Sequence, residues 1–215
     1  GLELFERTTR RYAKPEFGLN KTKLNSGPVN VTEEIVWSKP FCNLVHFRRD
    51  LPAGHRPDPK ILLIAPMSGH YATLLRGTVE TLLPKAEVYV TDWVDARMVP
   101  VLEGRFDLDD YIDYIVEFLR EIAERNGGSP AHMIAVCQPS VPAFAATAIM
   151  NGAKDEAAPK TLTMMGGPID TRKSPTTVND MAMKRPISWF RQNVVATVPA
   201  QYAGAGRRVY PGFMQ

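Results

Sequence analysis

Residues 131–139, Ala131-His132-Met133-Ile134-Ala135-Val136-Cys137-Gln138-Pro139, decide how this chain folds. A short apolar run ends on a cysteine and passes into an alanine-rich segment, which predicts a strand, a sharp turn and a helix. The thiol of Cys137 then stands at the apex of the turn. Gln138 keeps its backbone N–H, because the proline comes one residue later.

This layout is that of the nucleophile elbow of α/β-hydrolases, where the turn exposes the reactive atom and the next backbone N–H can bind an oxyanion. Small residues are expected two positions before and two positions after the nucleophile. Ala135 fits, and Pro139 is tolerable in the first helical turn, whose N–H groups have no partner within the helix. Cys137 is therefore a candidate nucleophile and the Gln138 N–H a candidate oxyanion donor. The alternative is a buried core thiol.

Six segments have the pattern of strands. Residues 31–37 and 41–47 predict an antiparallel hairpin at a sheet edge. Continuous apolar runs at 60–66, 86–93, 131–136 and 161–165 predict buried parallel strands separated by helices. The fold class we expect is α/β, an α/β-hydrolase fold with a mostly parallel sheet and helices on both faces, forming a single domain over 1–215.

The clearest predicted helix follows Asp107, which can cap its N-terminus. Asn126-Gly127-Gly128 is expected to end it. Apolar residues recur between these limits at three- and four-residue spacing: Leu108, Tyr111, Ile112, Ile115, Leu119 and Ile122. A second helical spacing over 184–198 fits the beginning of a cap, which we place at about 172–215. The alternative is an orphaned helix whose packing partners belong to the missing C-terminal part.

Composition restricts the class of protein. The chain has 215 residues, 44% of them hydrophobic and 23% charged, which suits one globular domain with a real core. Cys42 and Cys137 lie too far apart in the sequence to suggest a disulfide framework, which fits a reducing compartment. No apolar run is long enough to span a bilayer and no signal peptide is recognisable. We therefore expect a cytoplasmic protein without a transmembrane segment.

The formal net charge of +3 is too small to indicate nucleic-acid binding. Basic residues gather only near the N-terminus, at Arg7, Arg10, Arg11, Lys14, Lys21 and Lys23, with Glu16 opposing them. We interpret residues 1–28 as a solvated N-terminal arm. The alternative is an arm that touches an anionic surface.

The loop after the third predicted strand, at 66–70, is where this fold supplies its second oxyanion N–H. Met67 and Ser68 are the candidates, through their backbones, and a simple strand-to-helix turn is the alternative. His70 precedes the nucleophile, whereas the base of this fold follows it, so we assign His70 to the pocket. Trp93 is assigned to the pocket as well, although aromatic residues in strands more often belong to the core.

The catalytic base and acid are not evident in the sequence. The four histidines are His46, His55, His70 and His132, and none follows Cys137. Asp170 follows the sixth strand, but a loop aspartate is more often a cap or turn residue. An α/β-hydrolase normally has about eight strands across roughly 250 residues or more. We therefore expect the fold to be incomplete at the C-terminus, as the N-terminal part of a longer enzyme.

Several segments together resemble the intracellular poly(3-hydroxybutyrate) depolymerases, which degrade stored polyester granules in bacteria. They are LFER at 4–7 with Tyr12, APMSGHYATLLRGTV at 65–79, VYVTDW at 88–93, VCQPSVP at 136–142, GGPIDTR at 166–172 and VYPGF at 209–213. The resemblance implies Cys137 as the nucleophile, and it implies an acid and a histidine beyond residue 215. It also implies a polyester substrate and association with the granule surface in the cytoplasm.

The implied reaction is ester hydrolysis through a thioester on Cys137. A polyester synthase-like acyltransferase would use the same cysteine with a different acceptor. The third alternative is a non-catalytic fragment that binds polymer. We expect no metal and no other cofactor, because the histidines are scattered and no carboxylate–histidine cluster has ligand spacing.

Overall fold

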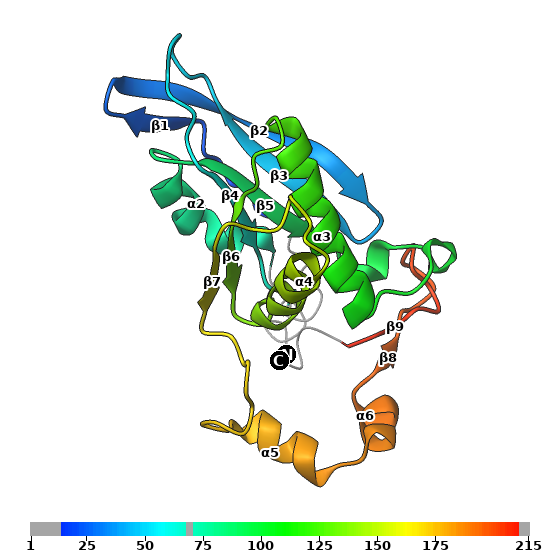
Figure 1. The fold of residues 1–215 in the computed structure, drawn as a ribbon. Coiled ribbons are helices and arrows are strands. Elements are labelled where there is room, and N and C mark those ends of the chain that lie inside the picture. The colour runs from blue at the N-terminus through cyan, green and yellow to red at the C-terminus, as the bar shows by residue number, and fades with distance from the viewer. Residues whose placement is uncertain (1–13, 68–70, 211–215) are drawn as a thin grey trace.

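A computed structural model describes residues 14–67 and 71–210 of the chain (Figure 1). Its main sheet contains β1 (Lys21–Leu24), β2 (Gly27–Lys39), β3 (Cys42–Arg49), β4 (Lys60–Ile64), β5 (Glu87–Trp93), β6 (His132–Val136) and β7 (Leu162–Met165). The helices are η1 (Ala72–Leu75), α2 (Arg76–Leu82), η2 (Ala96–Met98), η3 (Val101–Glu103), α3 (Leu108–Arg125), α4 (Ser140–Gly152), α5 (Thr177–Lys184) and α6 (Ile187–Asn193). A small second sheet pairs β8 (Ala196–Thr197) with β9 (Arg208–Val209).

The main sheet has the strand order β1-β2-β3-β5-β4-β6-β7. β1, β2 and β3 pair antiparallel with their neighbours, β3 pairs antiparallel with β5, and β5, β4, β6 and β7 run parallel. The six predicted strands are all present, and the four apolar runs form the parallel part. This is the α/β-hydrolase fold, so the predicted fold class is confirmed.

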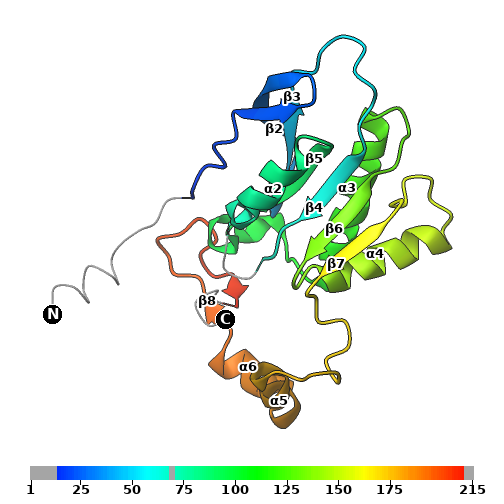
Figure 2. The same cartoon turned by 90° about the vertical axis from the view of Figure 1, so that its left-hand side faces the viewer.

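The winding of the chain reverses beside β4. The connection from β4 to β5 carries α2, and the connection from β5 to β6 passes back over β4 and carries α3. Because successive crossovers keep the same hand, helices α2 and α3 lie on opposite faces of the sheet (Figure 2). Ligands of open α/β sheets bind at the carboxyl ends of the strands where the winding reverses. Here that place lies between the ends of β4 and β6.

Each face of the sheet has its own hydrophobic core. On one side Leu62 and Met133, both fully buried, pack under α3 and α4. On the other side Leu63 and Val90, also fully buried, pack against α2. Alternate residues of the parallel strands therefore serve opposite cores, which explains why these strands read as continuous apolar runs.

The interpretation of residues 1–28 as a solvated arm is wrong for the described part of that segment. Phe17 and Leu19 are buried in the core on the α2 side, and the Phe17 ring packs edge-on against Phe47 with centroids 4.9 Å apart. Lys14 forms an ion pair with the buried Asp92. Residues 21–24 form β1, so the hairpin of β2 and β3 does not lie at the sheet edge. A short edge strand rich in lysine lacks the apolar alternation that would have predicted it.

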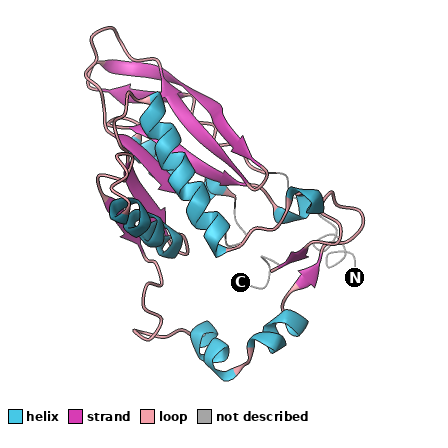
Figure 3. Cartoon of the chain, turned by 45° about the vertical axis from the view of Figure 1, so that its right-hand side comes forward, coloured by secondary structure: helices cyan, strands magenta, loops and turns pink. Residues whose placement is uncertain are grey.

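The C-terminal region departs from the helix expected over 184–198. Pro186 precedes α6, which ends at Asn193, and residues 196–197 belong to a strand. Figure 3 shows α5 and α6 set apart from the sheet and its helices. Neither helix has a buried residue. Proline allows a helix to begin but interrupts one already formed, which explains the division.

The helix predicted after Asp107 is confirmed as α3. The Asp107 side chain accepts hydrogen bonds from the N–H groups of Asp109 and Asp110, and the Asp110 carboxylate accepts one from Asp107 N–H. Asn126 is the C-terminal cap, and Gly127 follows with a φ of 64°. Helix α3 packs its buried side chains into the core that contains Leu62 and Met133.

Asp107→Ala is expected to lower the free energy of unfolding by about 1 kcal/mol, because two backbone N–H groups lose their acceptor. Asp107→Asn is the matched control, since asparagine caps helices about as well as aspartate. Urea unfolding followed by circular dichroism measures both variants. Equal stability of the alanine variant and the parent would show that the cap contributes nothing.

Candidate active site

The predicted elbow is present in the structure. β6 ends at Val136, Cys137 follows with a φ of 67°, and α4 begins at Ser140 after Pro139. A positive φ is uncommon for a residue with a side chain, and such strain gathers at functional sites. The Cys137 side chain is exposed, whereas Cys42 is fully buried in the core. The alternative of a buried core thiol therefore describes Cys42 and not Cys137.

Hydrogen bonds on both sides of the turn hold the Cys137 backbone. Its N–H donates to the Met165 carbonyl at 2.8 Å, which extends the pairing of β6 with β7 by one residue. Its carbonyl accepts a hydrogen bond from Ser140 N–H at 3.1 Å. Ser140 itself is fully buried, and its hydroxyl lies 3.5 Å from the Ala135 carbonyl. The elbow is thus fixed by β7 and by the first turn of α4.

Gly167 lies against the same turn, in the loop that leaves β7. A Cβ atom added at Gly167 would lie 2.0 Å from Ser140 Oγ and 2.9 Å from the Cys137 carbonyl oxygen. Only glycine fits at this distance. Gly166 before it adopts a φ of 66°, which brings the loop back over the elbow. The Gly166-Gly167 pair is a sequence signal for close backbone approach, but its partner could not be read from the sequence.

The loop after β4 reaches the elbow from the neighbouring strand. Met67 N–H donates a hydrogen bond to the Gln138 side-chain carbonyl, Oε1, at 3.4 Å. Among the described residues the backbone N–H of Gln138 has no acceptor. The structure therefore places the Met67 backbone N–H against the side chain of Gln138, the residue whose own N–H the sequence nominated from the other loop. Ser68 and His70 lie outside the described residues.

Trp93 ends β5 and supports the loop after β4. Its indole N–H donates to the Ala65 carbonyl at 2.9 Å, two residues before Met67. The ring packs edge-on against Tyr111 with centroids 4.5 Å apart, and it is half-buried among aromatic residues. The Ala65 N–H is held in turn by the Thr91 hydroxyl at 3.0 Å. Thr91 and Trp93 thus fix the position of the Met67 segment, a supporting role that the sequence did not reveal for Thr91.

The described histidines and Asp170 lie in other settings. His132 begins β6, at the end opposite to Cys137, and its ring is 2.9 Å from the Thr161 hydroxyl. His46 stacks on Tyr89 with centroids 4.3 Å apart. Asp170 accepts hydrogen bonds from the Arg172 guanidinium and backbone N–H, and these bonds lower the pKa of its carboxyl. Asp170 therefore forms a local turn, as loop aspartates commonly do.

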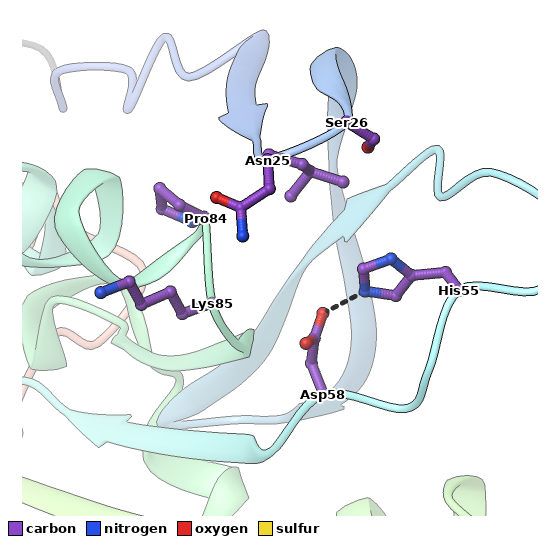
Figure 4. Close-up of a pocket in the computed structure, with 7 residues that line it drawn as sticks. Asn25, Ser26, His55, Asp58, Pro84 and Lys85 are labelled. Carbon is purple, nitrogen blue, oxygen red and sulfur yellow. Dashed lines mark hydrogen bonds and ion pairs between the residues drawn. The ribbon is translucent and has the colours of Figure 1, made fainter.

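The cavity in Figure 4 lies where the parallel strands begin, at the opposite ends of these strands from Cys137, and has a volume of about 300 Å³. It is lined by Leu24, Asn25, Ser26, His55, Asp58, Pro84 and Lys85, from the β1–β2 turn and the loops that enter β4 and β5. His55 Nε2 is 2.8 Å from Asp58 Oδ2, and the same oxygen accepts a hydrogen bond from the buried Arg49 at 2.8 Å. These loops precede the parallel strands, whereas Cys137 follows one. The cavity is therefore separate from the candidate active site.

The described part of the chain contains no group of three or more histidine, cysteine or acidic residues arranged to hold a metal ion. Within residues 14–67 and 71–210, every helix is too short or too polar to cross a bilayer.

The comparison with protein families gives a match at the C-terminal side of the elbow. Residues 166–215, which begin with Gly166 and the Gly167 that packs against Ser140, match the family described as "PHB de-polymerase C-terminus". The chain is thus similar to PHB depolymerases over this segment. The family resemblance inferred from the sequence is thereby confirmed, and the match includes GGPIDTR and VYPGF. No curated protein sequence matches the chain significantly.

Two solved structures illustrate what this chain resembles in fold. A thioesterase domain from the curacin biosynthetic pathway is 14% identical with a TM-score of 0.46, and the alignment covers 71% of this chain and 50% of that one. A putative lipase from Acinetobacter baumannii AYE is 13% identical with a TM-score of 0.46, over 80% of this chain and 57% of that one. The chain spans about half the length of these structures.

Gly167→Ala is expected to lower the free energy of unfolding by about 1–3 kcal/mol, because the added methyl group overlaps Ser140 and the Cys137 carbonyl. The reaction rate of the Cys137 thiol with iodoacetamide is expected to change as well, since the turn must shift. Gly77→Ala is the control: Gly77 lies inside α2, nothing would crowd its new methyl group, and alanine favours helix there. Unchanged stability and thiol reactivity in Gly167→Ala would contradict the packing of the elbow.

The ion pair at the cavity predicts a pH effect on stability. Partial burial raises the pKa of Asp58, but hydrogen bonds from His55 and Arg49 outweigh it and leave the pKa below its ordinary value. The carboxylate therefore stabilises the fold above the unfolded pKa of about 3.9, and this contribution is lost as the pH falls through the lower folded pKa.

Urea unfolding at a series of pH values below about 5 tests this effect. The parent is expected to lose stability more steeply with acidification than Asp58→Asn. Asp50→Asn is the control, because Asp50 is an exposed carboxylate paired with Arg48. Parallel curves for the parent and Asp58→Asn would show that the pair does not bias stability.

Proposed function

We propose that this chain carries the nucleophile of an intracellular poly(3-hydroxybutyrate) depolymerase, with Cys137 as the attacking group. The observation that supports it most directly is the exposed thiol on a positive-φ turn between β6 and α4. The PHB depolymerase family match over 166–215 supports the substrate class. The contact between Met67 and Gln138, where the winding of the chain reverses, supports acyl transfer through an oxyanion. Both residues have backbone N–H groups beside the turn that carries the thiol.

In the proposed reaction the Cys137 thiol gives its proton to a base, and the thiolate sulfur attacks an ester carbonyl carbon of the polymer. The carbonyl oxygen becomes an oxyanion that accepts hydrogen bonds from the N–H groups of Gln138 and Met67. Collapse breaks the ester C–O bond, and the leaving 3-hydroxyalkanoate oxygen takes a proton. Water then attacks the 3-hydroxyacyl thioester, which releases the acid and restores the thiol.

The base and the acid are not assigned to residues of this chain. The family resemblance implies a histidine and an acidic residue beyond residue 215. Their absence from the proposal affects the proton steps only. The covalent step and the oxyanion site rest on described residues.

Exposed apolar side chains beside the elbow support a polymeric, apolar substrate and contact with a granule surface. Met164 and Met165 at the end of β7 are 40% and 47% exposed, and Ile169 in the following loop is 47% exposed. Met183 and Ile187, from α5 and α6, are exposed by 88% and 68%. Aliphatic polyester has no hydrogen-bond donors along its chain, so apolar contact would supply much of its binding. We assign residues 172–215 to the beginning of a cap over this edge.

The complete gene product is the protein to test, with release of 3-hydroxybutyrate from amorphous polyester granules as the measurement. Cys137→Ala is expected to reduce release to the background, because no thioester can form. Cys42→Ala is the matched control: it removes the other thiol, which is buried in the core, and is expected to retain release. Release by Cys137→Ala would remove Cys137 from the mechanism.

A thiol reagent gives a second measurement on the same variants. The folded parent is expected to be labelled at Cys137 and not at Cys42, because burial shields the Cys42 thiol and raises its pKa. Labelling without any release by the parent would favour acyl transfer to another hydroxyl or to coenzyme A. Neither labelling nor release would favour a polymer-binding fragment.

A further inference from the structure

The hydrogen bond between Met67 N–H and Gln138 Oε1 uses the donor that the proposed function assigns to the oxyanion. An amide carbonyl and an ester carbonyl are similar acceptors, each a planar carbonyl oxygen with two lone pairs. The Gln138 side chain therefore stands where the reacting carbonyl would have to bind.

We propose that the Gln138 side chain is a resident occupant of the oxyanion site, which the ester carbonyl of the substrate displaces. This inference rests on the proposed function. In the free protein the glutamine amide satisfies Met67 N–H, and during the reaction the substrate oxygen takes its place. The backbone of Gln138 donates to the oxyanion, whereas its side chain competes with it.

The geometry makes the displacement easy. The contact between Met67 N–H and Gln138 Oε1 is 3.4 Å long, beyond the usual N–H···O range of about 2.7–3.2 Å, whereas the bonds to the N–H groups of Cys137 and Ala65 measure 2.8 and 3.0 Å. Gln138 is exposed, and its side chain makes no other hydrogen bond to a described residue. Rotation about its side-chain bonds therefore releases Met67 N–H without disturbing the core.

The two donors differ in occupancy, which suggests an order of events. Gln138 N–H has no acceptor among the described residues and can receive the carbonyl first. Met67 N–H joins once the side chain has moved. A substrate carbonyl can accept a hydrogen bond from Met67 N–H only if it replaces the bond from Met67 N–H to the Gln138 side chain. The Gln138 side chain therefore weakens substrate binding.

Gln138→Ala removes the competing acceptor and keeps the backbone N–H. The value of kcat/KM for a short soluble ester such as p-nitrophenyl butyrate is expected to rise about two- to tenfold, mainly through a lower KM, as a lost competing neutral hydrogen bond predicts. Gln138→Met separates the hydrogen bond from bulk, because methionine has a similar length and no amide carbonyl. A rise in kcat/KM in both variants supports displacement of a hydrogen-bonded side chain. A rise in Gln138→Ala alone would overturn the proposal, because it would show that the side chain only crowds the substrate.

The Met67 amide gives a readout that needs no turnover. In protein labelled with ¹⁵N-methionine, with the signal assigned through Met67→Leu, both Gln138 variants are expected to shift the Met67 amide resonance and speed its hydrogen exchange. An unchanged amide, or an unchanged or higher KM in both variants, would overturn the proposal while the proposed function stands. Failure of the proposed function looks different: the parent would hydrolyse the ester no faster than Cys137→Ala, and the oxyanion-site assignment would fall with it.

Discussion

The left-handed backbone of Cys137 is the constraint on which the rest of the site depends. A non-glycine residue in this region carries a cost on the order of 1–3 kcal/mol, and it persists only where the surrounding structure enforces it. Here the Cys137 N–H donates a hydrogen bond to β7, and the Cys137 carbonyl accepts one from the Ser140 N–H. Gly167 packs closely against the same turn. The strained turn is therefore supported by two segments, the end of β7 with the loop that follows it and the first turn of α4. These contacts hold the backbone of the turn while the Cys137 side chain stays exposed.

The reversal of winding beside β4 explains why a second loop reaches the turn. Parallel strands β4 and β6 are direct neighbours, so the residues that follow them emerge at the same edge. Their connecting helices diverge to opposite faces, which leaves the edge between them uncovered. Met67 and Gln138 meet there although they are 71 positions apart. The site we propose thus depends on topology, because the helices that follow β4 and β6 leave the carboxyl ends of these two strands on opposite faces of the sheet.

Much of this arrangement could be predicted from local pattern. The continuous apolar runs gave the parallel strands, Asp107 and the glycines gave both ends of α3, and the thiol after a strand gave the elbow. β1 could not be predicted, because Lys21 and Lys23 lack apolar alternation and gain strand structure only by pairing with β2. The packing of Gly167 on Ser140 and the bond from Met67 to Gln138 depend on which strands become neighbours. Such contacts follow from tertiary arrangement, and a single sequence holds no direct record of them.

The two edges of the sheet carry different kinds of interaction. At the edge where the parallel strands begin, the two terminal nitrogens of the buried Arg49 guanidinium donate to Asp58 and to the Leu83 carbonyl, so the charge is paired within the fold. At the edge where they end, the Cys137 thiol, the Gln138 N–H and the side chains of Met164 and Met165 are open to an incoming group. Strain at one place in a fold persists only where the surrounding structure supports it, and here the groups of the candidate site face outward from a well-packed sheet. The Gln138 side chain fits this division, because it gives Met67 a temporary partner that can leave.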